Sequence, residues 1–143
     1  MDGTRPKFGL HDSIGHHVTL AARQIERRVE DGLRAHKLTR TGWCVLVAVE
    51  EDGLKNPSEI AEFVGIDRTA TSRILRQLEE EGLIARQMGQ TDRRTTEVVL
   101  TDLGRNRMKD AMPICQENIA HYTGKLTAAE IVELKRILLK LRD

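Results

Sequence analysis

The sequence lacks several features that mark common protein classes. Its 143 residues hold two cysteines, Cys44 and Cys115, too few and too far apart for a disulfide scaffold or a CxxC zinc site. No apolar run approaches the roughly 20 residues that cross a bilayer. Residues 1–10 carry charges where a secretory signal would be apolar. We therefore expect a cytoplasmic protein with no membrane partner.

Sequence motifs of enzymes are also missing. The chain has no GxSxG elbow, no P-loop and no dinucleotide-binding fingerprint. It has no HExxH or acidic histidine cluster that would indicate a metal site. Aromatic residues make up only 3% of the chain, which argues against a base-stacking platform for single-stranded nucleic acid. We expect neither an enzyme nor a protein with a resident cofactor or metal.

The charge of the chain is nearly balanced, with 23 basic and 22 acidic residues and a net charge of +1. As a sum, this balance argues against a nucleic-acid partner, whose protein footprint is usually basic. The distribution along the chain is uneven, however. Residues 41–66 hold five acids and one base, whereas residues 68–78 hold three arginines and no acid. A small basic surface that contacts nucleic acid is therefore compatible with a net charge of +1.

Hydrophobic periodicity predicts a mainly helical fold with a small β-hairpin. Helices are expected over residues 12–37, from Thr39 to Asp52, from Pro57 to Val64, from Asp67 to about Glu81, over about 103–123 with a kink at Pro113, and after the capping box that starts at Thr127. Between the fourth and fifth helices, residues 84–88 and 95–100 alternate as two strands around a polar tip. Helix, turn, helix and hairpin is the order of a winged helix-turn-helix.

The second helix of this motif has two distinct faces. Thr71, Ile74, Leu75 and Leu78 are spaced to face the core, which leaves the other face to Arg68, Thr69, Ser72, Arg73 and Arg76. Small hydroxyl side chains let a helix enter the major groove, and arginine can donate two hydrogen bonds to guanine. A solvated basic face without any DNA role is the alternative, and the helix alone does not decide between the two.

The hairpin tip favours the DNA interpretation. Arg93 and Arg94 lie at a turn from which basic side chains can reach an adjacent minor groove. Asp92 beside them is unexpected on a DNA-binding surface. We expect it to pair with an arginine and fix its direction, although an unrelated surface pair is the alternative.

These segments resemble the MarR family of bacterial transcriptional regulators, and are most similar to its SlyA-like branch. The resemblance rests on Leu38-Thr39, Trp43-Cys44-Val45-Leu46, Ile60-Ala61-Glu62, Arg68-Thr69-Ala70-Thr71-Ser72-Arg73-Ile74-Leu75, Leu78-Glu79-Glu80-Glu81-Gly82-Leu83-Ile84, Thr91-Asp92-Arg93-Arg94 and Val99-Leu100-Thr101-Asp102-Leu103-Gly104. It implies a triangular homodimer whose two winged domains bind a pseudo-palindromic operator. It also implies that Asp92 braces Arg94, that Arg94 enters the minor groove and that Arg73 with its neighbours contacts the major groove.

The ends of the chain support a dimer independently of the resemblance. Amphipathic helices lie at both ends of this small protein, and we expect their apolar faces to pack against a second copy of the chain. Packing of these faces inside one chain is the alternative. We expect an N-terminal arm and dimerisation helix over residues 1–37. The winged helix-turn-helix domain would follow over residues 38–101, and C-terminal dimerisation helices over residues 102–143.

The family resemblance also implies a small phenolic or carboxylate effector that releases the DNA. Trp43, His17 and Arg23 are candidate contacts, supplying an apolar ring, a neutral donor and a cation. A plain core role for Trp43 is the more common one for a buried ring. Some relatives sense peroxide through a cysteine near the start of the first helix, but no cysteine precedes Cys44 here, and inert buried thiols are the simpler interpretation.

The sequence thus predicts a double-stranded DNA-binding transcriptional regulator, a repressor acting as a homodimer and released by a small effector. Two alternatives stay open. One is a winged-helix module that binds proteins, and the other is a redox- or metal-sensing regulator of the same fold.

Overall fold

The computed structural model describes Gly3 and residues 7–142. The N-terminal charges at Asp2 and Arg5 therefore lie outside the described residues. The elements, in chain order, are η1 (Leu10–Asp12), α1 (Ile14–Leu33), η2 (Arg34–His36), α2 (Arg40–Glu50), α3 (Pro57–Val64), α4 (Arg68–Glu80), β1 (Ile84–Met88), β2 (Thr96–Leu100), α5 (Asp102–Thr123) and α6 (Ala128–Leu141). This order confirms a mainly helical chain with a small hairpin. None of the described helices is long and apolar enough to cross a membrane.

Helix α1 is shorter than the periodicity predicts. Asp12 belongs to the preceding 3-10 turn, and Ser13 caps the helix by accepting a hydrogen bond from the His16 N–H. At the other end, Lys37 adopts a left-handed conformation with φ of 55°, and the Leu38 N–H donates to the Leu33 carbonyl. Such a left-handed residue terminates a helix. The chain therefore turns sharply before α2. The helix expected over residues 12–37 begins two residues later, at Ile14, and its last turn is the 3-10 helix η2.

The other helices begin where the sequence places their caps. Thr39, Asn56, Asp67, Thr101 and Thr127 each accept a hydrogen bond from a backbone N–H in the first turn. At α6, Thr127 and Glu130 form the complete capping box. Each cap satisfies one of the amides that a helix start leaves free. Helix α5 continues through Pro113 to Thr123.

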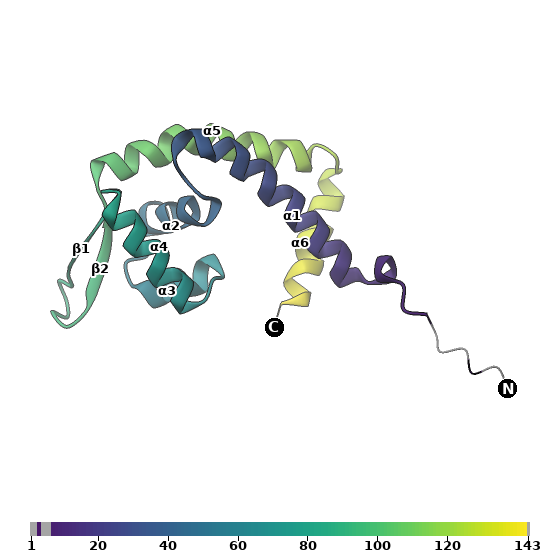
Figure 1. Cartoon of the computed structure of the whole chain (residues 1–143), viewed down its shortest axis with the longest axis horizontal. Helices are drawn as coiled ribbons and strands as arrows, with labels where there is room; N and C mark the ends of the chain where they lie inside the picture. Colours follow the sequence, from purple (N-terminus) through teal and green to yellow (C-terminus); the bar gives the residue numbers. More distant parts are fainter. Residues whose placement is uncertain (1–2, 4–6, 143) are drawn as a thin grey trace.

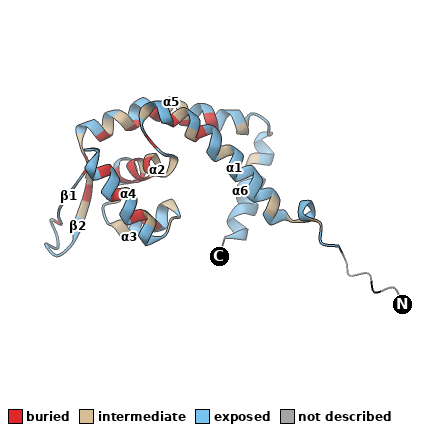
Figure 2. Ribbon diagram, in the orientation of Figure 1, coloured by how far each residue is buried: buried red, intermediate tan, exposed pale blue. Residues whose placement is uncertain are grey.

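The core surrounds α2, which lies in the middle of the winged domain (Figures 1 and 2). The largest fully buried side chains of this core come from α2 itself and from most of the other elements. They include Leu33, Leu46, Ile60, Leu75, Leu83, Val98 and Met108. Gly104 lets α5 approach the backbone of Leu83 so closely that a Cβ there would clash with the Leu83 carbonyl oxygen. The start of α5 is thereby held directly against the base of the hairpin.

The hairpin is anchored at its base and exposed at its tip. Strands β1 and β2 are antiparallel, with Ile84 opposite Leu100 and Met88 opposite Thr96. Ile84 and Leu100 are buried. The Val98 N–H also donates to the Lys55 carbonyl at 2.9 Å, which ties β2 to the segment before α3. The hairpin therefore projects from the domain as a wing (Figure 1).

The helix at the C-terminal end has little cover within the chain. Helix α6 buries none of its residues, although Val132, Leu134, Ile137, Leu138, Leu139 and Leu141 are large and apolar. Figures 1 and 2 show α6 at the end of the molecule opposite the wing and exposed along its length. On α1, Ile14 is also 71% exposed. An apolar helix face open to water is unfavourable for a single chain.

Candidate nucleic-acid interface

Helices α3 and α4 are joined by a short turn whose geometry is set locally. Gly65 ends α3 in a left-handed conformation with φ of 82°, which glycine adopts without strain. Asp67 then starts α4, because its Oδ1 accepts from the Ala70 N–H at 2.7 Å. The hydroxyl of buried Thr71 donates to the Asp67 carbonyl at 2.8 Å. These bonds fix where α4 begins and which face it presents.

The exposed face of α4 is the basic one. Thr71, Leu75 and Leu78 are buried and Ile74 is half-buried, which confirms the predicted core side. The opposite face exposes Arg68, Thr69, Ser72, Arg73 and Arg76. None of these three arginines makes an ion pair with another described residue, whereas Glu79, the first acid beyond them, lies 3.8 Å from the Arg86 guanidinium. The face therefore keeps three cations available to an outside partner.

At the wing tip, Asp92 holds the backbone. Its Oδ1 accepts from the Arg94 N–H at 3.0 Å, and its carbonyl accepts from both the Thr95 N–H and the Thr95 hydroxyl. Across the turn, the Gly89 N–H donates to the Thr95 carbonyl at 2.9 Å. The expected pairing of Asp92 with an arginine side chain is absent from the part of the chain described here. Asp92 instead orients Arg94 through its main chain and leaves both guanidinium groups exposed.

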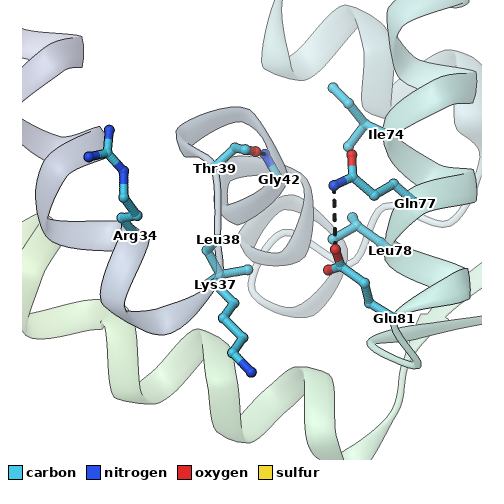
Figure 3. Close-up of a pocket in the computed structure, with 9 residues that line it drawn as sticks. All are labelled: Arg34, Lys37, Leu38, Thr39, Gly42, Ile74, Gln77, Leu78 and Glu81. Carbon is cyan, nitrogen blue, oxygen red and sulfur yellow. Dashed lines mark hydrogen bonds between the residues drawn. The ribbon is translucent and has the colours of Figure 1, made fainter.

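A groove lies on the core side of α4 (Figure 3). It holds about 170 Å³ between α4 and the junction of η2 with α2, and Ile74 and Leu78 form its inner wall. Gln77 donates a hydrogen bond to Glu81 along its edge at 3.3 Å. Neither Arg73 nor Arg76 lines this groove, so it is separate from the arginines of the basic face.

A second cavity contains Trp43, and we call it the Trp43 cavity. It holds about 150 Å³ between α1, α2 and α5, and its wall includes Ile25, Val29, Arg40, Cys44, Cys115, Asn118 and Tyr122. The half-buried Trp43 indole N–H donates to the Met108 carbonyl at 3.3 Å. The ring therefore both packs on α5 and forms part of a cavity wall.

The other two candidate effector contacts lie apart from Trp43. His17 and Arg23 are exposed on α1, and neither lines the Trp43 cavity. The His17 Nε2 lies 2.5 Å from the His11 carbonyl oxygen, to which its N–H donates. Arg40, Asn118 and Tyr122, which do line the cavity, carried no sequence signal, because α5 meets α1 and α2 only in the folded chain.

The two cysteines lie in the wall of the Trp43 cavity. Burial raises the pKa of the Cys44 thiol, and burial with the neighbouring Cys44 raises the pKa of Cys115 to about 11. The thiolate is the reactive form. A raised pKa keeps each thiol protonated up to a higher pH than in a free cysteine, so both are poor nucleophiles near neutral pH.

Alkylation of the native protein with iodoacetamide should therefore be slow at pH 7, with Cys115 slower than free cysteine. Its rate should continue to rise toward pH 11, since the thiolate fraction grows up to the pKa. Mass spectrometry of labelled peptides measures both sites, and the urea-unfolded chain is the control. Rapid labelling of native Cys115 at pH 7 would contradict this prediction.

Across Gly3 and residues 7–142, no group of three or more His, Cys, Asp or Glu side chains is arranged to hold a metal ion. The rings of His11, His16 and His17 do lie near one another, with centroids 5.4 to 6.5 Å apart. Their placement does not amount to a ligand set.

Comparison with known proteins gives a consistent result. Residues 38–96 match the model of the MarR family. The transcriptional regulator SarZ of Staphylococcus epidermidis is 29% identical over 87 residues, which span 61% of this chain and 59% of SarZ. The match therefore covers less than two thirds of that relative. SarZ is a transcriptional regulator, the class that the sequence predicts for this chain.

Solved structures share the fold over nearly the whole chain. One is Bordetella bronchiseptica BpsR, whose DNA binding is regulated by 6-hydroxynicotinic acid. Its structure has a TM-score of 0.87 at 23% identity, and the match covers 96% of this chain and 98% of BpsR. A mutant of Escherichia coli MarR complexed with operator DNA has a TM-score of 0.83 at 23% identity, covering 91% and 94%. The SlyA-like branch stays a prediction. Residues 38–96 thus match the model of the MarR family, and the chain shares the winged helix-turn-helix fold of these solved structures over nearly its whole length.

Proposed function

We propose that this protein is a transcriptional regulator that binds double-stranded DNA in a sequence-specific manner, as a repressor at a pseudo-palindromic operator. The observation that carries the proposal is the set of exposed arginines on α4 and at the wing tip that make no ion pair among the described residues. A DNA-bound MarR structure of the same fold supports it. As a proposed regulator of bacterial transcription, the protein would act in the cytoplasm, where its DNA lies.

Each basic element has its own part in this proposal. Helix α4 enters the major groove, where Arg73 contacts bases and where Arg68, Thr69, Ser72 and Arg76 contact bases or phosphates. The wing places Arg93 and Arg94 in the adjacent minor groove, and Asp92 sets the turn that directs them. The winged domain of residues 38–101 would thus contact DNA at two points.

The active unit in this proposal is a homodimer. Residues 1–37 and 102–143 supply the interface, since α6 and the start of α1 expose large apolar side chains that a second copy can cover. Two winged domains related by a twofold axis match two half-sites of a pseudo-palindrome. With a net charge of only +1, tight binding depends on pairing two small basic surfaces.

A small aromatic acid is the proposed effector, bound in the Trp43 cavity. The cavity joins helices of the winged domain to α1 and α5, so a ligand there can alter how the domain sits on the dimer base. The regulation of BpsR by 6-hydroxynicotinic acid supports this class of ligand. His17 and Arg23 would take part only where the second protomer brings α1 to the cavity.

The Arg94→Ala variant tests the DNA interface. It should weaken binding to a duplex selected from a random pool and to an unrelated duplex by similar factors, because a minor-groove arginine contributes mainly through charge. The slope of log affinity against log salt should fall by about 0.9 for each phosphate charge no longer neutralised. Gel shifts at several salt concentrations measure both effects.

Arg27→Ala, which removes an exposed arginine of α1 outside the winged domain, is the matched control and should leave the salt slope unchanged. Equal affinities for wild type and Arg94→Ala would contradict the assigned role of the wing. If wild type binds no duplex at low salt, the protein-binding winged-helix module becomes the better interpretation.

A further inference from the structure

We infer that Asn118 selects the effector by accepting a hydrogen bond from it, an inference that rests on the proposed effector-controlled function. Asn118 lies on α5 and is only 7% exposed. Its amide Nδ2–H donates to the Ile25 carbonyl of α1 at 3.4 Å. Its Oδ1 has no hydrogen-bond partner among the described residues.

A buried acceptor without a donor is unfavourable, and folded proteins retain few of them. In a cavity wall, such a group favours a ligand that supplies the missing O–H or N–H. It also disfavours a ligand of the same shape that has no donor at that point, because the acceptor then stays unpaired. Asn118 is therefore placed to discriminate between ligands as well as to hold one.

Asn118 lies where two cavities share a wall. The first is the Trp43 cavity, of about 150 Å³. The second, which we call the Lys125 cavity, holds about 220 Å³ between α1 and the C-terminal end of α5. Ile25, Asn118 and Tyr122 line both. A ligand that extends from one cavity into the other therefore passes the Asn118 side chain.

The two cavities differ in charge. In the Trp43 cavity, the one cation is Arg40, whose guanidinium lies 3.9 Å from Glu26 and whose backbone N–H donates to the Glu30 carboxylate at 2.7 Å. These acids offset its charge.

The Lys125 cavity has Arg28, His121 and Lys125 in its wall and no acid. Arg28 lies 3.8 Å from Glu117, whereas Lys125 makes no ion pair with any described residue. An anionic group is therefore better matched to the Lys125 cavity than to the Trp43 cavity.

These features define a ligand class and an orientation. A cavity of about 150 Å³ can hold a single aromatic ring, and Trp43 supplies an aromatic wall for it. The effector is thus a one-ring aromatic acid whose ring occupies the Trp43 cavity and whose carboxylate extends toward Lys125. Its ring hydroxyl or N–H donates to Asn118 Oδ1.

Isothermal titration of the full chain with the three monohydroxybenzoates and their matched methoxybenzoates tests the selection. Wild type should bind at least one hydroxy acid roughly tenfold more tightly than its methyl ether, since only the hydroxyl can donate. Asn118→Leu, of nearly the same shape, should bring the two affinities together. Asn118→Asp keeps the acceptor oxygens and should keep the preference. Asn106→Leu, at an exposed asparagine of the same helix, is the matched control and should match wild type.

Lys125→Gln tests the orientation, since it should weaken binding of every acid without changing the hydroxy-to-methoxy ratio, and should do so more than Arg40→Gln. A larger loss in Arg40→Gln would overturn the orientation. Equal affinities for the paired ligands in wild type, no binding of either, or an unchanged preference in Asn118→Leu would overturn the inference about Asn118. Gel shifts without ligand separate the two proposals, because a protein that binds DNA but no hydroxybenzoate refutes only this one.

Discussion

A variant with Leu134→Lys and Leu138→Lys is expected to be monomeric and to lose tight DNA binding. The two leucines are four residues apart on α6, lie on one side of it, and are 44% and 38% exposed in the single chain. Covering them with a second copy would remove apolar surface from water, which is favourable by about 25 cal/mol per Å². Two buried ammonium groups without partners would reverse that gain.

Loss of the dimer removes the advantage of linked binding. When one winged domain has bound its half-site, the second binds at a high effective concentration, which raises affinity by a factor of about 10² to 10⁴. The monomer should therefore bind the selected duplex more weakly by about that factor. Size-exclusion chromatography with light scattering measures the mass, and gel shifts measure the affinity.

The control is Lys135→Ala with Lys140→Ala, which changes two charged positions of the same helix and should stay dimeric. Circular dichroism checks that the lysine variant keeps its helices, as expected for a helix that buries nothing within its own chain. A wild type that is monomeric at micromolar concentration would refute the proposed dimer, as would a lysine variant that still dimerises.

Replacing Arg73 by alanine is expected to lower affinity for the selected duplex by about 1–3 kcal/mol per half-site and to relax base preference at one position. Arg73 lies on the exposed face of α4, with Thr69 and Ser72 beside it to permit a close approach to the groove. A guanidinium can donate two hydrogen bonds to one guanine, so its loss affects that base pair more than the others.

Arg73→Lys separates charge from geometry. Lysine keeps the positive charge but lacks the planar fork, so part of the affinity should return without the base preference. Glu80→Ala, on an exposed position at the end of α4, is the control and should bind like wild type. Competition with duplexes that carry each single base change in one half-site measures the preference. A uniform loss across all these duplexes would assign Arg73 to the phosphate backbone instead.

Most of the winged domain was predictable from local patterns. The faces of α4 follow from a 3.6-residue period, which sets Leu75 and Leu78 on one side and Arg73 and Arg76 on the other. The helix starts follow from caps that bond to amides two or three residues away, as at Asp67 and Thr127. Local rules succeed here because the interacting groups are neighbours in sequence.

Local sequence rules did not predict two other structural details. The last turn of the expected first helix is the 3-10 helix η2, which ends at left-handed Lys37, although lysine is a good helix former and no glycine or proline marks the site. At the wing tip, the sequence places Asp92 beside two arginines but does not say whether it bonds their side chains or the main chain. The geometry of the seven-residue loop between β1 and β2 directs its Oδ1 to the Arg94 N–H.

The effector pocket was the least predictable feature. Trp43 lies in a cavity wall, but the residues around it come from α1 and from α5, more than 70 positions later in the chain for Asn118. Whether Asn118 faces Ile25 or solvent depends on how these two helices cross. No periodicity within either helix contains that information, which is why Arg40, Asn118 and Tyr122 were missed and why His17 and Arg23 were expected at a cavity they do not line.

The amino-acid sequence by itself determined the order of elements, the basic face of α4 and the two arginines of the wing. The net charge of the whole chain is close to zero, but the charges are unevenly distributed. The three arginines of residues 68–78 lie together with no acid among them. Tertiary structure alone decided that Asp92 holds a backbone turn, that α6 is left uncovered, and that the Asn118 carbonyl is buried without a donor. The physical reason is range: capping and periodicity act over a few residues, whereas helix crossings bring together groups that the chain keeps far apart.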